Sequence, residues 1–297
     1  MVLLGIALIV PVLAVASRLP KSPLPHSATG CAKVLPKGQS VGKVYNVTIP
    51  SGDGTRSLLI SIPPSYNSNA PAPLILSYHG GDRDATDQLQ LDEFTNPAFN
   101  SNSYVVYPQG IKDTWQGVPD VTANDIQFTT DILDYVQSQY CIDTTRIFAT
   151  GKSDGGGFCN VLACDPTLSS RIAAFAPVSG AFYIDSSLCM PSKVDIPCKN
   201  SRSNIPFLEF HGGNDSTIPY KGGPDRGSVF QPSHTSSNRL NTGLVEHIYD
   251  SVIGHDWPST APNADNQRPD HHVASFNATP IVLEFFKQNF LNSRELK

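Results

Sequence analysis

The 297-residue sequence predicts a single α/β domain, built on one doubly wound and mostly parallel sheet that begins with an antiparallel hairpin. Three observations favour this fold class. Two runs of alternating polarity flank a Gly-Asp-Gly turn near the start, several short apolar runs ending in Gly follow, and helix-like stretches lie between some of them. A hydrophobic content of 39% supports one large core, and 16% charged residues is too few to suggest disorder.

The strands are predicted from these short runs. Residues 44–51 and 57–66 alternate apolar and polar positions, as the two strands of a half-exposed hairpin do. Buried parallel strands are instead nearly continuous apolar runs. Such runs occur at residues 73–80, 104–110, 146–151, 173–180 and 206–212, and a last strand is expected within 244–254.

Three helices are predicted between and after these strands. Residues 125–140 carry apolar side chains at roughly the helical period of 3.6, and residues 155–163 form a helix-like stretch after a glycine-rich turn. Residues 280–290 form an amphipathic C-terminal helix, for which Thr279 is the expected N-cap before Pro280.

The N-terminus resembles a targeting segment. An uncharged apolar run extends from Val2 to Ala16 and ends in a small-x-small pattern. Because it is short for a membrane span and a Pro-rich polar stretch follows, we predict a signal peptide over residues 1–16, with an uncleaved anchor as the alternative. An extended segment, 17–40, and the main domain, 41–297, then follow, in a secreted protein with no membrane association after cleavage.

The charge pattern excludes one class of partner. The formal net charge is -5, and neither a basic cluster nor a run of like charges is present. The basic surface that nucleic-acid binding needs is therefore missing from the sequence, and the mild acidic balance favours solubility.

The cysteines fit an oxidising compartment. Six are present, which allows up to three disulfides, and we expect Cys189 to pair with Cys198 because they close a short loop. No cysteine has zinc-site spacing, so no metal is expected. Asn46 and Asn277 are predicted glycan sites, whereas the sequon at Asn214 is expected to be unmodified. The remaining cysteines are Cys31, Cys141, Cys159 and Cys164.

The clearest functional signal is the pentapeptide Gly151-Lys152-Ser153-Asp154-Gly155. It follows a predicted strand and precedes a helix-like stretch, which is the context of the nucleophile elbow in α/β-hydrolases. The strained turn needs small residues two positions to either side of the serine, and the helix N-terminus favours negative charge at its oxygen. The plainer interpretation is a tight glycine turn with an ordinary serine. We predict that Ser153 is a nucleophile and that the fold is an α/β-hydrolase.

A serine nucleophile needs a base and an acid, which follow in the order acid and then histidine in this fold. His255 comes directly after the last predicted strand and is the predicted base, with His271 and His272 in the same loop as alternatives. Asp215 lies a few residues beyond the strand at 206–212 and is the predicted acid. Its alternative is an Asx turn in a Gly/Asn-rich loop.

Acyl transfer also requires donors to the oxyanion. The backbone N–H groups of Asp154 and Gly81 are predicted to supply them, with Asp82 next to the latter and His79 in a structural role. Tyr78, Trp115 and Trp257 are candidate walls of a substrate pocket, although aromatic residues at such positions pack in the core as often. No cofactor is needed.

Longer stretches carry a resemblance to a known family. They include SYHGGDRDAT, YVVYPQGIKDTWQG, CIDTTRIFATGKSDGGGF, LEFHGGNDSTIPYKGG and GHDWPSTAPNADNQ, within residues 30–290. The chain resembles the secreted fungal feruloyl esterases of carbohydrate esterase family one, which are relatives of polyhydroxybutyrate depolymerases. The resemblance implies a triad of Ser153, Asp215 and His255, and hydrolysis of ferulate and related hydroxycinnamate esters on plant cell-wall arabinoxylan. We expect a monomer.

Two alternatives stay open. The same triad would serve an acetylxylan or polyhydroxyalkanoate esterase. The chain is also shorter than the resembled family between Tyr220 and Val245, where it has no apolar residues at helical spacing to form a covering helix. This shortening motivates a third hypothesis, an inactive hydrolase fold that binds the cell wall.

Overall fold

A computed structural model defines the fold. It describes residues 27–52, 54–185, 198–225, 228–230, 245–269 and 271–291. The predicted signal peptide, residues 1–16, lies outside these ranges. No helix in the described part of the chain has both the length and the apolar character needed to cross a membrane.

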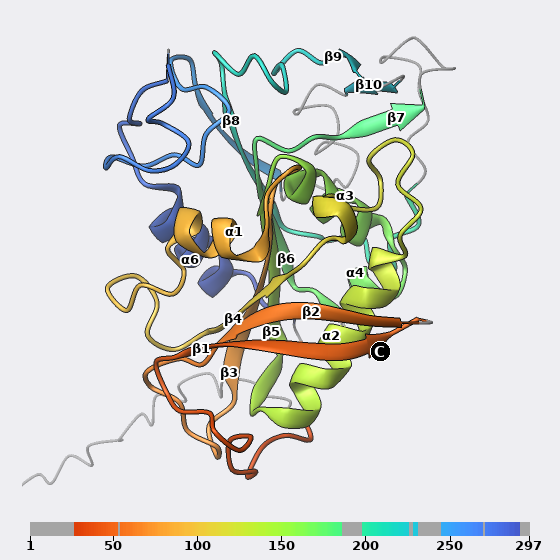
Figure 1. Ribbon diagram of the computed structural model, residues 1–297, viewed down its shortest axis with the longest axis vertical. Helices are drawn as coiled ribbons and strands as arrows, with labels where there is room; N and C mark the ends of the chain where they lie inside the picture. The colour runs from red at the N-terminus through yellow and green to blue at the C-terminus, as the bar shows by residue number, and fades with distance from the viewer. Residues whose placement is uncertain are drawn as a thin grey trace, which may run out of the picture.

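One sheet organises the molecule (Figure 1). Within the described residues it has eight strands in the order β1-β2-β4-β3-β5-β6-β8-β11. The last six strands of this order run parallel, β2 pairs antiparallel with β4, and β1 pairs antiparallel with β2. The predicted mostly parallel sheet with an antiparallel start is confirmed. The strands are β1 (Val44–Ser51), β2 (Gly54–Ser61), β3 (Ala72–Tyr78), β4 (Tyr104–Pro108), β5 (Ile142–Lys152), β6 (Ala174–Val178), β8 (Phe207–Gly212) and β11 (Val245–Asp250).

The hairpin differs from the prediction at its second strand. Strands β1 and β2 pair from Val44 opposite Ser61 to Ser51 opposite Gly54, and Gly52 takes a φ of 57° at the turn. The prediction extended this strand to residue 66. The strand ends at Ser61 because Pro63 and Pro64 follow shortly after, and proline has no N–H to donate to a strand ladder.

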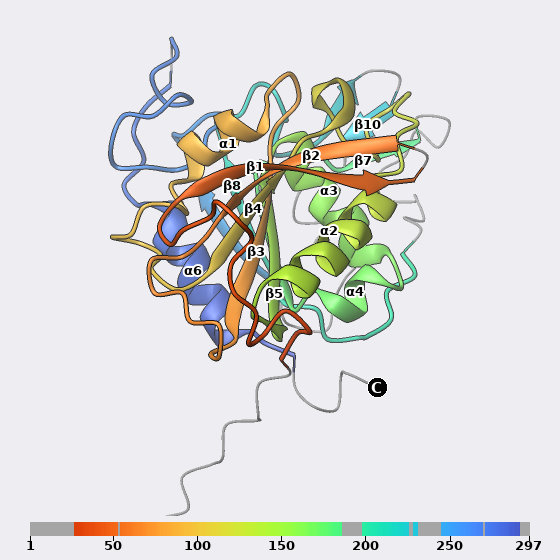
Figure 2. The ribbon, with the colours of Figure 1, turned by 60° about the horizontal axis from the view of Figure 1, so that its bottom comes forward.

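Helices cover both faces of the sheet, as Figures 1 and 2 show. One face carries α2 (Asp125–Gln139), α3 (Asp154–Cys164) and α4 (Leu168–Arg171), and the other carries α1 (Ala85–Asp92) and α6 (Ala278–Gln288). Each layer encloses its own apolar core. The first core contains Phe128, Ile132, Leu133 and Phe158, and the second contains Phe148, Val282, Phe285 and Phe286.

The helix α6 begins earlier than predicted. Asn277 occupies its N-cap position, and Thr279 lies inside the first turn. The Thr279 hydroxyl is buried, donates to the carbonyl of Asp92 at 2.6 Å and accepts from the indole Nε1 of Trp257 at 3.0 Å. The predicted N-cap role of Thr279 is therefore wrong, because its side chain joins two other segments instead of closing its own helix.

Several short elements were not predicted. The helix α1 has a capping box formed by Asp84 and Asp87. The described residues also include a short helix η1 (Ile111–Asp113) and a small three-stranded sheet, β7 (Tyr183–Asp185), β9 (Gly223–Asp225) and β10 (Ser228–Phe230).

Two disulfides lie within the described residues, Cys31–Cys141 and Cys164–Cys198. The first ties the N-terminal segment to the start of β5, and the second joins the end of α3 to the segment before β8. The predicted pair Cys189–Cys198 is wrong because Cys198 bonds Cys164, and Cys189 lies outside the described residues. Cys159 is a buried free thiol on α3, and burial raises its pKa.

Candidate active site

Ser153 lies at the turn between β5 and α3. Its backbone has φ 56° and ψ −120°, a left-handed conformation that is strained for a residue with a side chain. The N–H of Ser153 donates to the carbonyl of Val178, and its own carbonyl accepts from Gly157 and Ala181. This is the strand–turn–helix geometry that the Gly-x-Ser-x-Gly pattern predicts.

Glycine is required on either side of Ser153 because neighbouring backbone atoms leave no room for a Cβ atom. A Cβ on Gly155 would lie 2.5 Å from the carbonyl oxygen of His79, and one on Gly151 would lie 2.7 Å from that of Tyr78. A Cβ on Gly80 would lie 3.3 Å from the Cβ of Ser153. The turn after β3 therefore packs directly on the serine turn, and only glycine permits this approach.

His255 and Asp215 meet beside this turn. The ring Nδ1 of His255 lies 2.8 Å from the Oδ2 atom of Asp215, and both side chains are buried. The other oxygen of Asp215 accepts from the N–H groups of Thr217 and Ile218 at 3.0 and 2.7 Å. Asp215 thus forms the Asx turn of the alternative interpretation and also contacts the imidazole.

This contact determines which ring nitrogen of His255 is free to act as a base. A neutral ring donates its Nδ1 proton to Asp215, so Nε2 keeps its lone pair. Burial, followed by the positive charge of Lys152, lowers the pKa of His255, while Asp215 and Asp265 act in the opposite direction. The net shift favours the neutral ring that a general base needs near neutral pH.

A second buried pair supports Asp215 from behind. The Nε2 atom of His211 lies 2.8 Å from the carbonyl of Ile218 and 3.4 Å from the Oδ2 atom of Asp215, and its Nδ1 atom lies 3.2 Å from Glu209. Burial lowers the pKa of His211, but the hydrogen bond and charge of Glu209 outweigh it, so the pKa is raised.

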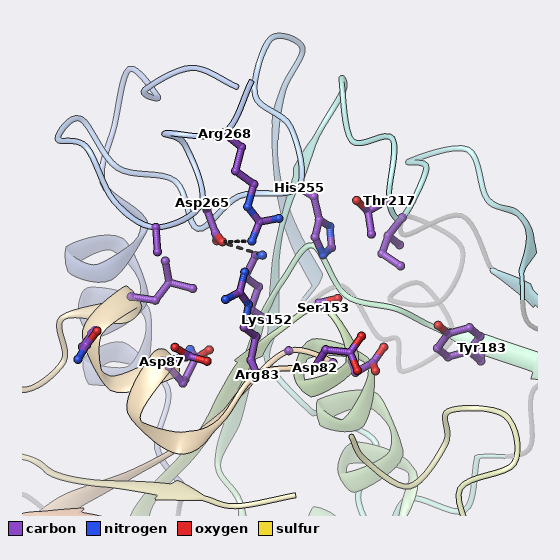
Figure 3. Close-up of a pocket in the computed structure, with 18 residues that line it drawn as sticks. Asp82, Arg83, Asp87, Lys152, Ser153, Tyr183, Thr217, His255, Asp265 and Arg268 are labelled. Atoms are coloured by element: carbon purple, nitrogen blue, oxygen red, sulfur yellow. Dashed lines mark hydrogen bonds and ion pairs between the residues drawn. The ribbon is translucent and has the colours of Figure 1, made fainter. Parts of the chain in front are cut away.

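A cavity of about 340 Å³ opens above the serine turn (Figure 3). Ser153, His255, Gly81 and Asp154 line it, and Figure 3 shows the His255 ring directed toward Ser153. Most of the remaining lining is polar or charged. It includes Asp82, Arg83, Asp87, Gln88, Lys152, Thr217, Asp265 and Arg268, together with Leu91, Tyr183 and Ile218.

A backbone hydrogen bond distinguishes Asp82 from Gly81 as the candidate oxyanion donor after β3. The N–H of Asp82 donates to the carbonyl of Asp113 at 3.0 Å and is therefore engaged elsewhere. Gly81 packs against the Asp154 side chain, and Asp154 is the first residue of α3. Gly81 and Asp154 thus remain the candidate donors.

The three aromatic residues predicted as pocket walls do not line this cavity. Tyr78 and Trp115 are fully buried, where Trp115 stacks on Phe158 and donates to the carbonyl of His79. Trp257 is 1% exposed and packs edge-on against Phe94. The prediction is wrong for this cavity because these rings fill the cores on the two faces of the sheet.

The alternative base candidates, His271 and His272, and the structural candidate His79 have separate surroundings. The Nδ1 atom of His271 lies 2.5 Å from the Oδ1 atom of Asp256, and neither His271 nor the exposed His272 lines the cavity. His79 is buried, its Nδ1 atom lies 2.8 Å from the carbonyl of Gly80, and its Nε2 atom accepts from the N–H of Gly110. Burial lowers its pKa, which fits the structural role predicted for it.

Sequence reasoning missed an ion pair in the cavity wall. The ammonium of Lys152 lies 3.0 Å from the Oδ2 atom of Asp265, and both side chains are less than 10% exposed. Lysine inside the serine motif is a signal, since a charged residue before a buried turn needs a partner. Its partner is 113 positions away, so the sequence could not identify it. Within the described ranges, no group of three or more His, Cys, Asp or Glu side chains could hold a metal ion.

Comparison with known proteins finds esterases of similar sequence. No family model matches the chain. The sequence is 31% identical over 173 residues to feruloyl esterase B of Piromyces equi, covering 57% of this chain and 31% of that protein. It is 30% identical over 151 residues to a bifunctional acetylxylan esterase/xylanase of Neocallimastix patriciarum, covering 50% and 20%. It is 28% identical over 213 residues to feruloyl esterase D of Neurospora crassa, covering 68% and 66%.

Solved structures share the fold. A thermostable esterase superposes with a TM-score of 0.59 at 17% identity, over 84% of this chain and 63% of that one. A CE1 ferulic acid esterase of Anaeromyces mucronatus superposes with a TM-score of 0.52 at 16% identity, over 78% and 91%. The sheet order, the serine turn and these matches show an α/β-hydrolase fold.

Within that class, the chain is similar in sequence to fungal feruloyl esterases, which confirms the resemblance carried by its motifs. It spans less than two thirds of the length of each of the three relatives.

Proposed function

We propose that this chain is a serine esterase that hydrolyses feruloyl and related hydroxycinnamoyl esters through Ser153, His255 and Asp215. The observation that carries the proposal is the 2.8 Å contact between His255 and Asp215 at the wall of the cavity that Ser153 lines. The similarity to fungal feruloyl esterases supports the choice of ester.

In the first step, the hydroxyl oxygen of Ser153 attacks the ester carbonyl while Nε2 of His255 takes its proton. Asp215 holds the Nδ1–H of the ring and stabilises the imidazolium that forms. The carbonyl oxygen becomes an oxyanion, which accepts from the backbone N–H groups of Asp154 and Gly81. The N-terminal end of α3 adds a favourable dipole.

In the second step, the tetrahedral intermediate collapses and the carbon–oxygen bond to the alcohol breaks. The imidazolium of His255 protonates the leaving alcohol, and the acyl group stays on Ser153. Water, deprotonated by His255, then attacks the acyl carbonyl. The bond to the Ser153 oxygen breaks, the carboxylic acid leaves, and the imidazolium of His255 returns its proton to the Ser153 oxygen. The chain's own side chains and one water molecule account for every proton transfer.

The same proposal covers the setting of the reaction. A signal peptide over residues 1–16 would direct the chain out of the cell, where feruloylated arabinoxylan of plant cell walls would be its substrate. Asn46 is exposed on β1 and is a suitable glycan site. Asn277 accepts hydrogen bonds from Thr260 through its side-chain oxygen, which leaves its amide nitrogen for a glycan.

A second candidate, an acetylxylan esterase, is favoured by the polarity of the cavity. Tyr183 is the sole phenylalanine, tyrosine or tryptophan among the described residues that line it, so few rings face a phenolic acyl group. An acetyl group needs no such surface. The acetylxylan esterase/xylanase of Neocallimastix patriciarum provides a matching relative.

The two candidates are separated by assaying methyl ferulate and para-nitrophenyl acetate side by side, with Ser153→Ala as the blank. A higher kcat/KM for methyl ferulate supports the feruloyl esterase, and turnover of the acetate alone supports the second candidate. A folded protein that hydrolyses neither ester supports the inactive wall-binding hypothesis, and binding to arabinoxylan would then be measured directly.

A further inference from the structure

The charged wall of the cavity contains an interaction that links the serine turn to the histidine loop. The Oδ2 atom of Asp265 lies 3.0 Å from the ammonium of Lys152 and also accepts from the backbone N–H of Trp257 at 3.0 Å. Lys152 directly precedes Ser153, and Trp257 is two residues beyond His255. One oxygen atom thus contacts both segments that carry the proposed nucleophile and base.

The loop that presents Asp265 is itself held in place. The side-chain amide of Asn263 donates to the carbonyl of Trp257, and its oxygen accepts from the N–H groups of Asp265 and Asn266. The indole of Trp257 donates to Thr279 on α6. Asp265 is therefore a fixed acceptor, and its ion pair with Lys152 constrains the distance between the two segments.

We propose that Lys152 and Asp265 are positioning residues that hold the Ser153 turn against the His255 loop. Their two charges also determine the electrostatic environment of the His255 ring. The inference rests on the proposed esterase function, because it assigns roles to Ser153 and His255. It requires both the ion pair and the backbone contact with Trp257.

The two charges act on His255 in opposite directions. Lys152 lowers the pKa of His255, after burial itself, and Asp265 raises it. Burial alone would raise the pKa of Asp265, but Lys152 and the Trp257 N–H outweigh it and hold that pKa below its usual value. The other charged groups that face His255 or line its cavity are Asp215, Asp82, Arg83, Asp87, Asp154 and Arg268, with His211 behind Asp215.

Because Lys152 and Asp265 shift the pKa of His255 in opposite directions, removing each charge should have an opposite effect on the pH profile. In Lys152→Met the ammonium is lost, so the pKa of His255 should rise and the acid limb of the kcat/KM profile should move to higher pH. In Asp265→Asn the carboxylate is lost, so the limb should move to lower pH. In the double variant the two shifts should largely cancel. Each single variant should also lose about ten- to a hundredfold in kcat, because the two segments are no longer held together.

Two further variants separate positioning from general destabilisation. Lys152→Arg keeps the positive charge and should retain the wild-type pH profile. Arg56→Gln removes an equally buried ion pair, Arg56–Asp125, that does not line the cavity. It should lower thermal stability without moving the pH profile.

A measurement that does not depend on catalysis distinguishes failure of the positioning proposal from failure of the proposed esterase function. The His255 ring is titrated by NMR in histidine-labelled Ser153→Ala protein, with and without each substitution, and its signal is assigned with His255→Gln. Opposite displacements of the titration midpoint support the inference even if no ester is hydrolysed. Equal midpoints in all variants, or shifts of the same sign in both single variants, would overturn it. An inactive wild type with the expected midpoints would refute the esterase function alone.

Discussion

Replacing Gly155 by alanine tests how strictly the serine turn depends on close backbone contact. An added Cβ would lie 2.5 Å from the carbonyl oxygen of His79 and 2.6 Å from the carbonyl carbon of Tyr78. Ordinary contact begins at about 3.4 Å, so the end of β3 or the start of α3 must move by about 1 Å. These two segments carry Gly81 and Asp154, the proposed oxyanion donors. Because both neighbours are backbone, a side-chain rotation cannot relieve the overlap.

We expect Gly155→Ala to lose about 1–3 kcal/mol of stability through overpacking. We also expect kcat/KM to fall about a hundredfold, since a 1 Å misplacement of reacting groups costs about that much. Thermal unfolding and ester hydrolysis measure the two effects. Gly54→Ala is the matched control, because a Cβ there meets no atom within 4 Å. Wild-type turnover and melting temperature in Gly155→Ala would refute the argument that this contact sets the site.

Three further predictions rest on the geometry of the candidate site, and a fourth rests on the sequence between Tyr220 and Val245. Ser153→Ala should abolish ester hydrolysis with unchanged circular dichroism, a loss on the order of a million-fold in one well-studied protease; a tenth of wild-type activity would contradict the role. His255→Ala should be inactive while His271→Ala and His272→Ala stay close to wild type in the same assay. The acid limb of kcat/KM should lie below the ordinary histidine pKa of about 6.5, because burial and then Lys152 lower the pKa of His255, so protonation removes the base only at more acidic pH. Restoring the missing stretch within residues 220–245 from a longer relative should increase monomer yield in size-exclusion chromatography and methyl ferulate turnover; equal values would show that it is dispensable.

Much of the sheet was predictable because buried parallel strands have a simple signature. The runs at 104–110, 173–180 and 206–212 each contain a strand within a few residues of the expected limits. The helix α1 was not predictable in the same way. Its buried positions include Gln88 and Asp92, which bond Ser77 and Tyr107, so the helix has no apolar stripe.

The candidate site was partly predictable for a related reason. The strained turn needs glycine at defined positions, and strand ends are where residues of this fold converge, so Ser153, Asp215 and His255 could be selected by order. Contacts between distant loops leave no local pattern. The Lys152–Asp265 pair and the Cys164–Cys198 bond are of this kind. The aromatic walls were misplaced because a tryptophan near the site has the same sequence signature whether it faces a cavity or the core.

The buried thiol of Cys159 has a consequence for how long a preparation stays usable. It lies on α3 five residues before Cys164, which is bonded to Cys198. In the folded chain, burial raises the pKa of Cys159 and keeps it in the unreactive thiol form. Once α3 unfolds, the pKa of the thiol returns to its ordinary value, and the thiolate can attack the Cys164–Cys198 disulfide. This exchange releases a new free thiol that can react with other disulfides. Heat damage then becomes permanent through scrambled bridges, so mildly acidic storage or a Cys159→Ala variant should extend shelf life.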